Sequence, residues 1–121
     1  MVRDVSPEEA ADAIANTKVL FVDCWAPWCG PCLALAPTME ELDSRYADND
    51  DIGFIKINTQ NYREFAMQYN IAAIPCVLVY KDGQPATFEM DDPRMGGKIK
   101  TDRLIGLRPI EHYEKVIEQL L

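Results

Sequence analysis

Hydrophobic runs along the chain predict a central β-sheet. The longest run, VLFVDCWA (19–26), is nearly continuous and rich in β-forming residues, so we expect a strand that is covered on both faces. Two further runs, IGFIKIN (52–58) and IPCVLVY (74–80), predict additional strands. The turn residues KDG (81–83) then predict a tight turn into a neighbouring strand near Thr87–Met90.

Between these runs, hydrophobic residues recur every three or four positions, which is typical of helices with one buried face. Ser6 and Glu9 form a capping-box pattern that marks the start of the first helix. Pro37 lies inside the second helix and is expected to kink it near Leu33, because proline has no backbone N–H to donate. The buried positions of the four helices are Ala10, Ala13 and Ile14, then Cys32, Leu35, Met39, Leu42 and Tyr46, then Tyr62, Phe65, Ala66 and Tyr69, and finally Ile110, Tyr113, Val116, Ile117 and Leu120.

The order of these elements predicts an α/β fold in one domain, residues 1–121. Strands that are joined through helices run parallel by right-handed crossovers, whereas the tight turn makes an antiparallel pair. A last strand is expected near Arg103–Gly106, and Val2–Val5 could add a short strand at the edge. We therefore predict a central mixed sheet of four to five strands with helices on both faces.

Composition and charge narrow the possible partners and the compartment. Of the 121 residues, 48% are hydrophobic, and 20 acids against 12 bases give a net charge of −8. An acidic protein is repelled by nucleic acid and by anionic lipid, so we expect neither as a partner. The opening MVRDVSPEEA has no apolar core of a signal peptide, and no apolar run approaches the roughly 20 residues that cross a bilayer. We expect a cytoplasmic protein.

Two of the four cysteines lie in the segment WAPWCGPC (25–32). In a cytosolic protein, such a pair is more often catalytic or metal-binding than a structural disulfide. Cys29 falls where a strand ends and a helix begins, and the unpaired N–H groups there favour the thiolate. Cys32, three residues later, can reach Cys29 and close a small disulfide. Gly30 leaves the approach to the sulfur open, and Pro31 stiffens the first turn.

This arrangement favours thiol–disulfide exchange. The Cys29 thiolate would attack a partner's disulfide, and Cys32 would then break the mixed disulfide and release the reduced product. We expect Cys29 to be the exposed sulfur and Cys32 to point into the domain. Asp23 interrupts the apolar strand just before the thiols, where burial favours a protonated carboxyl. It could accept the Cys32 proton, although a purely structural carboxylate is the alternative interpretation.

Ile74-Pro75 is a second candidate element of the site. A proline that opens a central strand serves a turn or a cis peptide bond, and the sequence leaves the choice open. If Pro75 lies beside the thiols, the backbone of Ile74 could pair with a substrate segment as an added strand. Such binding would have little sequence preference.

The motif VDCWAPWCGPC (22–32), with Pro37 and the later Ile74-Pro75, closely resembles the thioredoxin family over nearly the whole chain. The resemblance implies the thioredoxin fold, a cis Pro75 packed against the thiols, and Trp25 packed beneath the docking surface. It also implies reduction of protein disulfides, recharging by a thioredoxin-reductase-type electron donor, no bound cofactor and no metal. We expect a monomer.

The same resemblance assigns roles to single residues. It implies Cys29 as nucleophile, Cys32 as the resolving thiol and Asp23 as proton relay. It places Trp28 and Ile74 on the surface that docks partners. The chain departs from the family pattern in four ways. Leu33 stands where a basic residue is common, Cys76 stands where threonine is frequent, a hairpin is inserted at 93–100, and the strand before the first helix is nearly absent.

Three alternatives remain open from the sequence. Cys24, Cys29, Cys32 and Cys76 match a ligand spacing of iron–sulfur electron carriers, although bulky residues fill the intervening loop. A disulfide isomerase, or a redox-sensing module that docks partners through 93–100, would use the same thiol pair. Lys56 is either a buried partner of Asp23 or an ordinary lysine with a solvated ammonium.

Overall fold

The computed structural model describes residues 1–92 and 94–121. The helices are α1 (Pro7–Asn16), α2 (Gly30–Arg45), α3 (Arg63–Gln68) and α4 (Ile110–Leu120). The strands are β1 (Arg3–Asp4), β2 (Val19–Trp25), β3 (Ile52–Asn58), β4 (Cys76–Lys81), β5 (Gln84–Pro85), β6 (Phe88–Asp91), β7 (Lys98–Thr101) and β8 (Arg103–Ile105). The capping box at Ser6 and Glu9 is present, and α2 is continuous through Pro37.

The central sheet is mixed, as predicted. Its order is β1-β3-β2-β4, and both β5 and β8 pair with β4. Strands β1 and β2 run parallel to β3, whereas β4 runs antiparallel to β2. Within the described residues the sheet has six strands, because the two-residue strands β1 and β5 add to the longer ones. The expected edge strand near Val2–Val5 is confirmed as β1.

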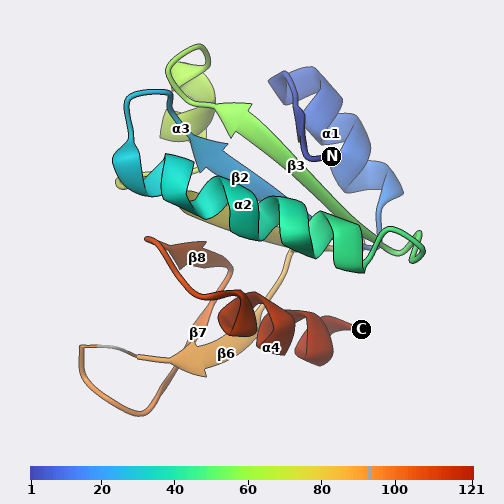
Figure 1. Cartoon of the computed structure of the whole chain (residues 1–121), viewed down its shortest axis with the longest axis vertical. Coiled ribbons are helices and arrows are strands. Elements are labelled where there is room, and N and C mark those ends of the chain that lie inside the picture. The colour runs from blue at the N-terminus through green and yellow to red at the C-terminus, as the bar shows by residue number, and fades with distance from the viewer. Residues whose placement is uncertain (93) are drawn as a thin grey trace.

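Helices cover both faces of this sheet (Figure 1). Helices α2 and α4 pack on the face that carries Phe21 and Val77, in one large apolar cluster. Helices α1 and α3 pack on the face that carries Leu20 and Val22. Strand β2 is buried along nearly its whole length, which confirms the expectation for the run VLFVDCWA. The α/β fold class is therefore confirmed.

The strand predicted near Thr87–Met90 exists, but its predicted position beside β4 is wrong. Strand β6 pairs with β7 in a separate two-stranded sheet, in the register Phe88↔Thr101. The chain leaves the central sheet after Ala86, because Phe88 is buried in the cluster that α4 helps to form. The insertion predicted at 93–100 is this β6–β7 hairpin, and Pro93 lies outside the described residues.

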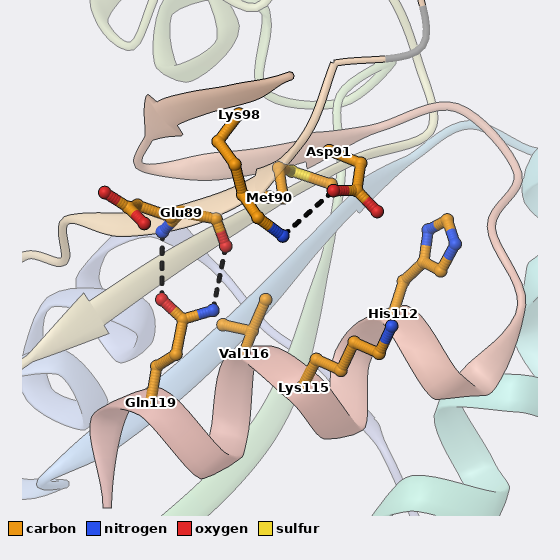
Figure 2. Close-up of a pocket in the computed structure, with 8 residues that line it drawn as sticks. All are labelled: Glu89, Met90, Asp91, Lys98, His112, Lys115, Val116 and Gln119. Atoms are coloured by element: carbon orange, nitrogen blue, oxygen red, sulfur yellow. Dashed lines mark hydrogen bonds and ion pairs between the residues drawn. The ribbon is translucent and has the colours of Figure 1, made fainter. Parts of the chain in front are cut away.

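A side-chain amide holds the hairpin against α4 (Figure 2). The Glu89 N–H donates to Gln119 Oε1 at 2.9 Å, and Gln119 Nε2 donates to the Glu89 carbonyl oxygen at 2.8 Å. Gln119 thus satisfies both backbone groups of Glu89, as an additional strand would. On the hairpin itself, Lys98 Nζ lies 3.0 Å from Asp91 Oδ1.

Replacing this amide should loosen the hairpin locally. In Gln119→Ala, we expect the exchange rate of the Glu89 amide hydrogen to rise about fivefold, because one lost hydrogen bond is worth roughly 1 kcal/mol. Hydrogen-exchange NMR measures this rate. Glu118→Ala, an exposed neighbour on α4, serves as the control and should leave it unchanged. Equal exchange rates of the Glu89 amide in Gln119→Ala and in the parent protein would show that the Gln119 side chain does not hold the hairpin against α4.

Candidate active site

The thiol pair lies where β2 leads into α2. Cys29 is the N-cap of α2, with an extended backbone, and its Sγ accepts a hydrogen bond from the Cys32 N–H at 3.2 Å. An N-cap position leaves the first N–H groups of the helix unpaired, and here a sulfur takes the place of the usual oxygen. The predicted helix start inside CGPC is confirmed. The helix dipole and this hydrogen bond both favour negative charge on Cys29 Sγ.

Cys29 and Cys32 form a disulfide, with their Cα atoms 5.2 Å apart. Both residues are buried, Cys29 at 5% and Cys32 at 2% exposure, so the expectation of an openly exposed Cys29 is wrong for this oxidised state. The cause is packing, because Ala26, Trp25 and Ile74 surround the pair. Gly30 is exposed, and an added Cβ there would meet nothing within 4 Å.

The loop before β4 closes the other side of the pair. The Ile74–Pro75 bond is cis, as the resemblance implied. The Ile74 carbonyl oxygen lies 3.8 Å from Cys29 Sγ. Gly106, which has a left-handed backbone with φ of 86°, donates its N–H to the Pro75 carbonyl at 2.8 Å. The active-site loop, the proline loop and the end of β8 therefore meet around Cys29.

Large apolar side chains are exposed around this meeting point. Trp28 is 71% exposed, and Ile105 and Leu107, on either side of Gly106, are 49% and 55% exposed. Sequence reasoning singled out Trp28 but missed Ile105 and Leu107. These two residues could have been found only by expecting the last strand, β8, to pair with β4. That pairing brings Gly106 against Pro75.

Asp23 is buried on the α2 side of the sheet, at 3% exposure. Burial raises its pKa to about 7, against the opposing charge of Lys56, and Asp4 raises it slightly further. Lys56 is the register neighbour of Asp23 on β3, and its ammonium lies 5.0 Å from the centre of the Trp25 ring. Lys56 is half-buried, with its charge over the indole, which favours the interpretation as a lysine with a solvated ammonium.

Comparison with known proteins decides the family. A model of the family described as thioredoxin matches residues 1–103. A thioredoxin from Staphylococcus aureus is 33% identical over 110 residues, which cover 91% of this chain and 89% of the relative. The chain belongs to the thioredoxin family.

Solved thioredoxins superpose on almost the whole of this family member. The oxidised thioredoxin from Plasmodium falciparum aligns with a TM-score of 0.73 at 28% identity, over 98% of this chain and 97% of the other. Mitochondrial thioredoxin 3 from Saccharomyces cerevisiae shares the fold, with a TM-score of 0.75 at 24% identity, over 98% of this chain and 95% of the other. Together, family membership and the Cys29–Cys32 pair identify a thiol–disulfide oxidoreductase that acts on protein disulfides.

The other two cysteines of this thioredoxin-family chain lie on the opposite face of the sheet. Cys24 and Cys76 face each other across β2 and β4, and both are buried. Burial raises the pKa of both thiols, which keeps them uncharged and unreactive. In residues 1–92 and 94–121, no three His, Cys, Asp or Glu side chains are grouped as metal ligands. The iron–sulfur alternative is therefore not favoured.

None of the described helices is both long and apolar enough to cross a membrane. The one histidine, His112, lines the pocket between α4 and the β6–β7 hairpin, together with Lys98 and Lys115 (Figure 2).

The buried Asp23 carboxyl should make stability depend on pH. Its folded pKa, about 7, lies above the value near 4 of an unfolded chain, so the folded state holds a proton that the unfolded state has released. The stability that this proton contributes is therefore fully present below about pH 4 and is lost as the pH rises through about 7. Asp23→Asn should remove this loss and stabilise the oxidised protein by about 2–4 kcal/mol at pH 8.

Urea unfolding of the oxidised protein between pH 4 and pH 8 measures this effect. Asp12→Asn, which changes an exposed carboxyl on α1, is the matched control and should follow the parent protein. If the free energy of unfolding changed with pH in the same way for Asp23→Asn and for the parent, Asp23 would already be charged at low pH. The prediction would then be wrong.

Proposed function

We propose that this protein reduces protein disulfides with Cys29 as the attacking thiolate, Cys32 as the resolving thiol and Asp23 as the base. The observation that carries this assignment is the hydrogen bond from the Cys32 N–H to Cys29 Sγ at the N-terminus of α2. It favours negative charge on Cys29 alone, because Cys32 lies one turn inside the helix. The thiolate is the nucleophile in disulfide exchange.

The reaction then proceeds in two exchanges. Cys29 Sγ attacks one sulfur of the substrate disulfide, the bond between the substrate sulfurs breaks, and the departing thiolate takes a proton from solvent. Asp23 accepts the Cys32 proton, and the Cys32 thiolate attacks Cys29 Sγ. The mixed disulfide breaks, the second substrate thiol leaves with a proton, and the Cys29–Cys32 disulfide forms. Two electrons have passed to the substrate.

The carboxyl of Asp23 suits the second exchange because its pKa of about 7 lies close to neutral pH. A base with such a pKa is ionised often enough to accept a proton and still binds that proton well. An ordinary exposed carboxylate would be a much weaker base. Burial in β2 therefore supports the assignment of Asp23 as the base.

The substrate segment would lie across Trp28, Gly30, Pro31, Ile74 and Pro75. The exposed Trp28 indole offers an apolar contact, and the Ile74 carbonyl, 3.8 Å from Cys29 Sγ, lies where an added strand could donate an N–H. Backbone pairing of this kind would accept many sequences, which suits a general reductant. Ile105 and Leu107 would extend the apolar contact.

Family membership supports the remaining assignments. The electron donor that restores the dithiol would be a thioredoxin-reductase-type protein, which returns two electrons and two protons. We further propose that residues 1–121 act as a single domain and as a monomer, and that the compartment is the cytoplasm. Neither a disulfide isomerase nor a redox-sensing docking module is favoured by the family comparison.

A Cys32→Ser variant should trap the mixed disulfide. With insulin as substrate, the reduced variant should accumulate a covalent adduct through Cys29, because no thiol remains to resolve it. Non-reducing electrophoresis and peptide mass spectrometry would identify the linkage. Cys29→Ser is the matched control, in which neither adduct nor insulin reduction is expected. An adduct through Cys24 or Cys76, or reduction by Cys29→Ser, would contradict the assignment.

A further inference from the structure

Two buried polar atoms among the described residues have no hydrogen-bond partner. They are Asp23 Oδ1 and the hydroxyl oxygen of Tyr113. Folded proteins leave very few such atoms, because an unpaired buried polar group costs about 1–3 kcal/mol. One of the two is the proposed base. The other belongs to α4, a helix that the reaction described above does not use.

Tyr113 packs against the same face of the sheet as Asp23. It is fully buried, and its ring centre lies 6.3 Å from that of Phe21 on β2. Side chains of a strand alternate between faces, so Asp23 is the next residue after Phe21 on this face, roughly 7 Å further along. The Tyr113 ring therefore packs on the face of β2 that carries Asp23, against the residue two positions before it.

The charge of Asp23 acts on the Tyr113 hydroxyl. Burial raises the pKa of Tyr113 above its ordinary value, the Asp23 charge raises it further, and Arg108 opposes both. Arg108 lies in the loop that precedes α4. Cys76, on the other face of the sheet, raises this pKa as well, and Asp23 is the one carboxyl that acts on it among the described residues.

We propose that Tyr113 is a positioning residue for the resolving step, whose hydroxyl donates a hydrogen bond to the Asp23 carboxylate through one shared water molecule. No direct hydrogen bond joins the two atoms, so a bridging water is the partner that would satisfy both. This inference rests on the proposed role of Asp23 as the base. It adds a second side chain, from the opposite end of the chain, to the control of that base.

The effect on Asp23 follows from the direction of the hydrogen bond. A donor that pairs with the charged carboxylate favours the charged form and lowers the pKa of Asp23, whereas burial raises it. Tyr113 would thus oppose burial and keep a fraction of Asp23 ionised near neutral pH. The ionised carboxylate is the form that can accept the Cys32 proton.

Other groups that face Asp23 come from each neighbouring element. Lys56 on β3 and Asp4 on β1 act on the carboxyl, and they are unchanged by any substitution of Tyr113. The register neighbour on β4 is the uncharged Val77, which pairs in turn with Leu104 on β8. Helix α2 contributes the Cys29–Cys32 pair. On the side of α4 the group is Tyr113, and the Asp23 charge also acts on the buried thiols Cys24 and Cys76.

The test is Tyr113→Phe, which keeps the ring and removes only the hydroxyl. Carbon NMR of the Asp23 carboxyl in the oxidised protein should show its titration midpoint move to higher pH by about half to one unit. Closure of the Cys29–Cys32 disulfide from a Cys29–glutathione adduct, followed by quenched-flow mass spectrometry, should slow about twofold to fivefold at pH 7, in proportion to the ionised fraction of Asp23. The two rates should converge at pH 9.

Tyr46→Phe is the matched control, because the Tyr46 hydroxyl has its own acceptor, Glu114 Oε2, at 2.8 Å. It should leave the midpoint and the closure rate unchanged. A loss of stability in Tyr113→Phe without a shifted midpoint would mean that Tyr113 is only structural, and the proposal would be overturned.

The outcomes also separate this inference from the proposed function. If Asp23→Asn abolishes the pH dependence of closure while Tyr113→Phe keeps that of the parent, Asp23 remains the base and only the role of Tyr113 fails. If Asp23→Asn keeps the parental pH dependence, the base itself is misassigned. A high-resolution crystal structure of the unmodified protein gives a test that needs no variant, because it should contain a water within hydrogen-bond distance of both oxygens. Two oxygens with no such water would overturn the proposal.

Discussion

The proposed chemistry of the thiol pair depends on one hydrogen bond, from the Cys32 backbone N–H to Cys29 Sγ at the first turn of α2. A helix start has N–H groups that seek an acceptor, and in this chain the acceptor is a reactive sulfur. The sulfur is held there because β2, buried on both faces, fixes the point from which α2 leaves the sheet. Pro31 fits the first turn without the loss of a hydrogen bond, because a backbone N–H at this position would have no partner within the helix. The start of α2 and the buried strand β2 thus support the proposal that Cys29, and not Cys32, is the attacking thiolate.

The second constraint is a carboxyl in the most buried strand of the sheet. Burial of a charged carboxylate is unfavourable, so burial raises the pKa of Asp23 to about 7 and the carboxyl stays protonated below that pH. The same property that weakens the fold at high pH suits Asp23 to the role of base that we propose for it. The buried oxygens of Asp23 and Tyr113 that lack hydrogen-bond partners destabilise the folded state. Local losses of stability of this kind are expected at functional sites.

Much of the fold and the thiol site could be predicted because the signals are local. The capping box at Ser6, the apolar run 19–26 and the helix start in CGPC each depend on residues close in sequence. The partner of β6 could not be predicted, because an alternating strand has the same pattern whichever neighbour it pairs with. Its position follows from burial of Phe88 against the cluster that includes α4, a contact between distant residues. The packing of Tyr113 against Phe21 could not be predicted for the same reason.

The most direct test of the central claim is the pH dependence of Cys29 alkylation in the reduced protein. Iodoacetamide labelling, quantified for each cysteine by peptide mass spectrometry, would be compared with labelling of a free cysteine derivative, which becomes a thiolate near pH 8.5. We expect Cys29 to react first and to react rapidly already near neutral pH, while Cys24 and Cys76 stay unlabelled in the folded state. A Cys29 that follows the free cysteine derivative, or that reacts after Cys32, would contradict this expectation.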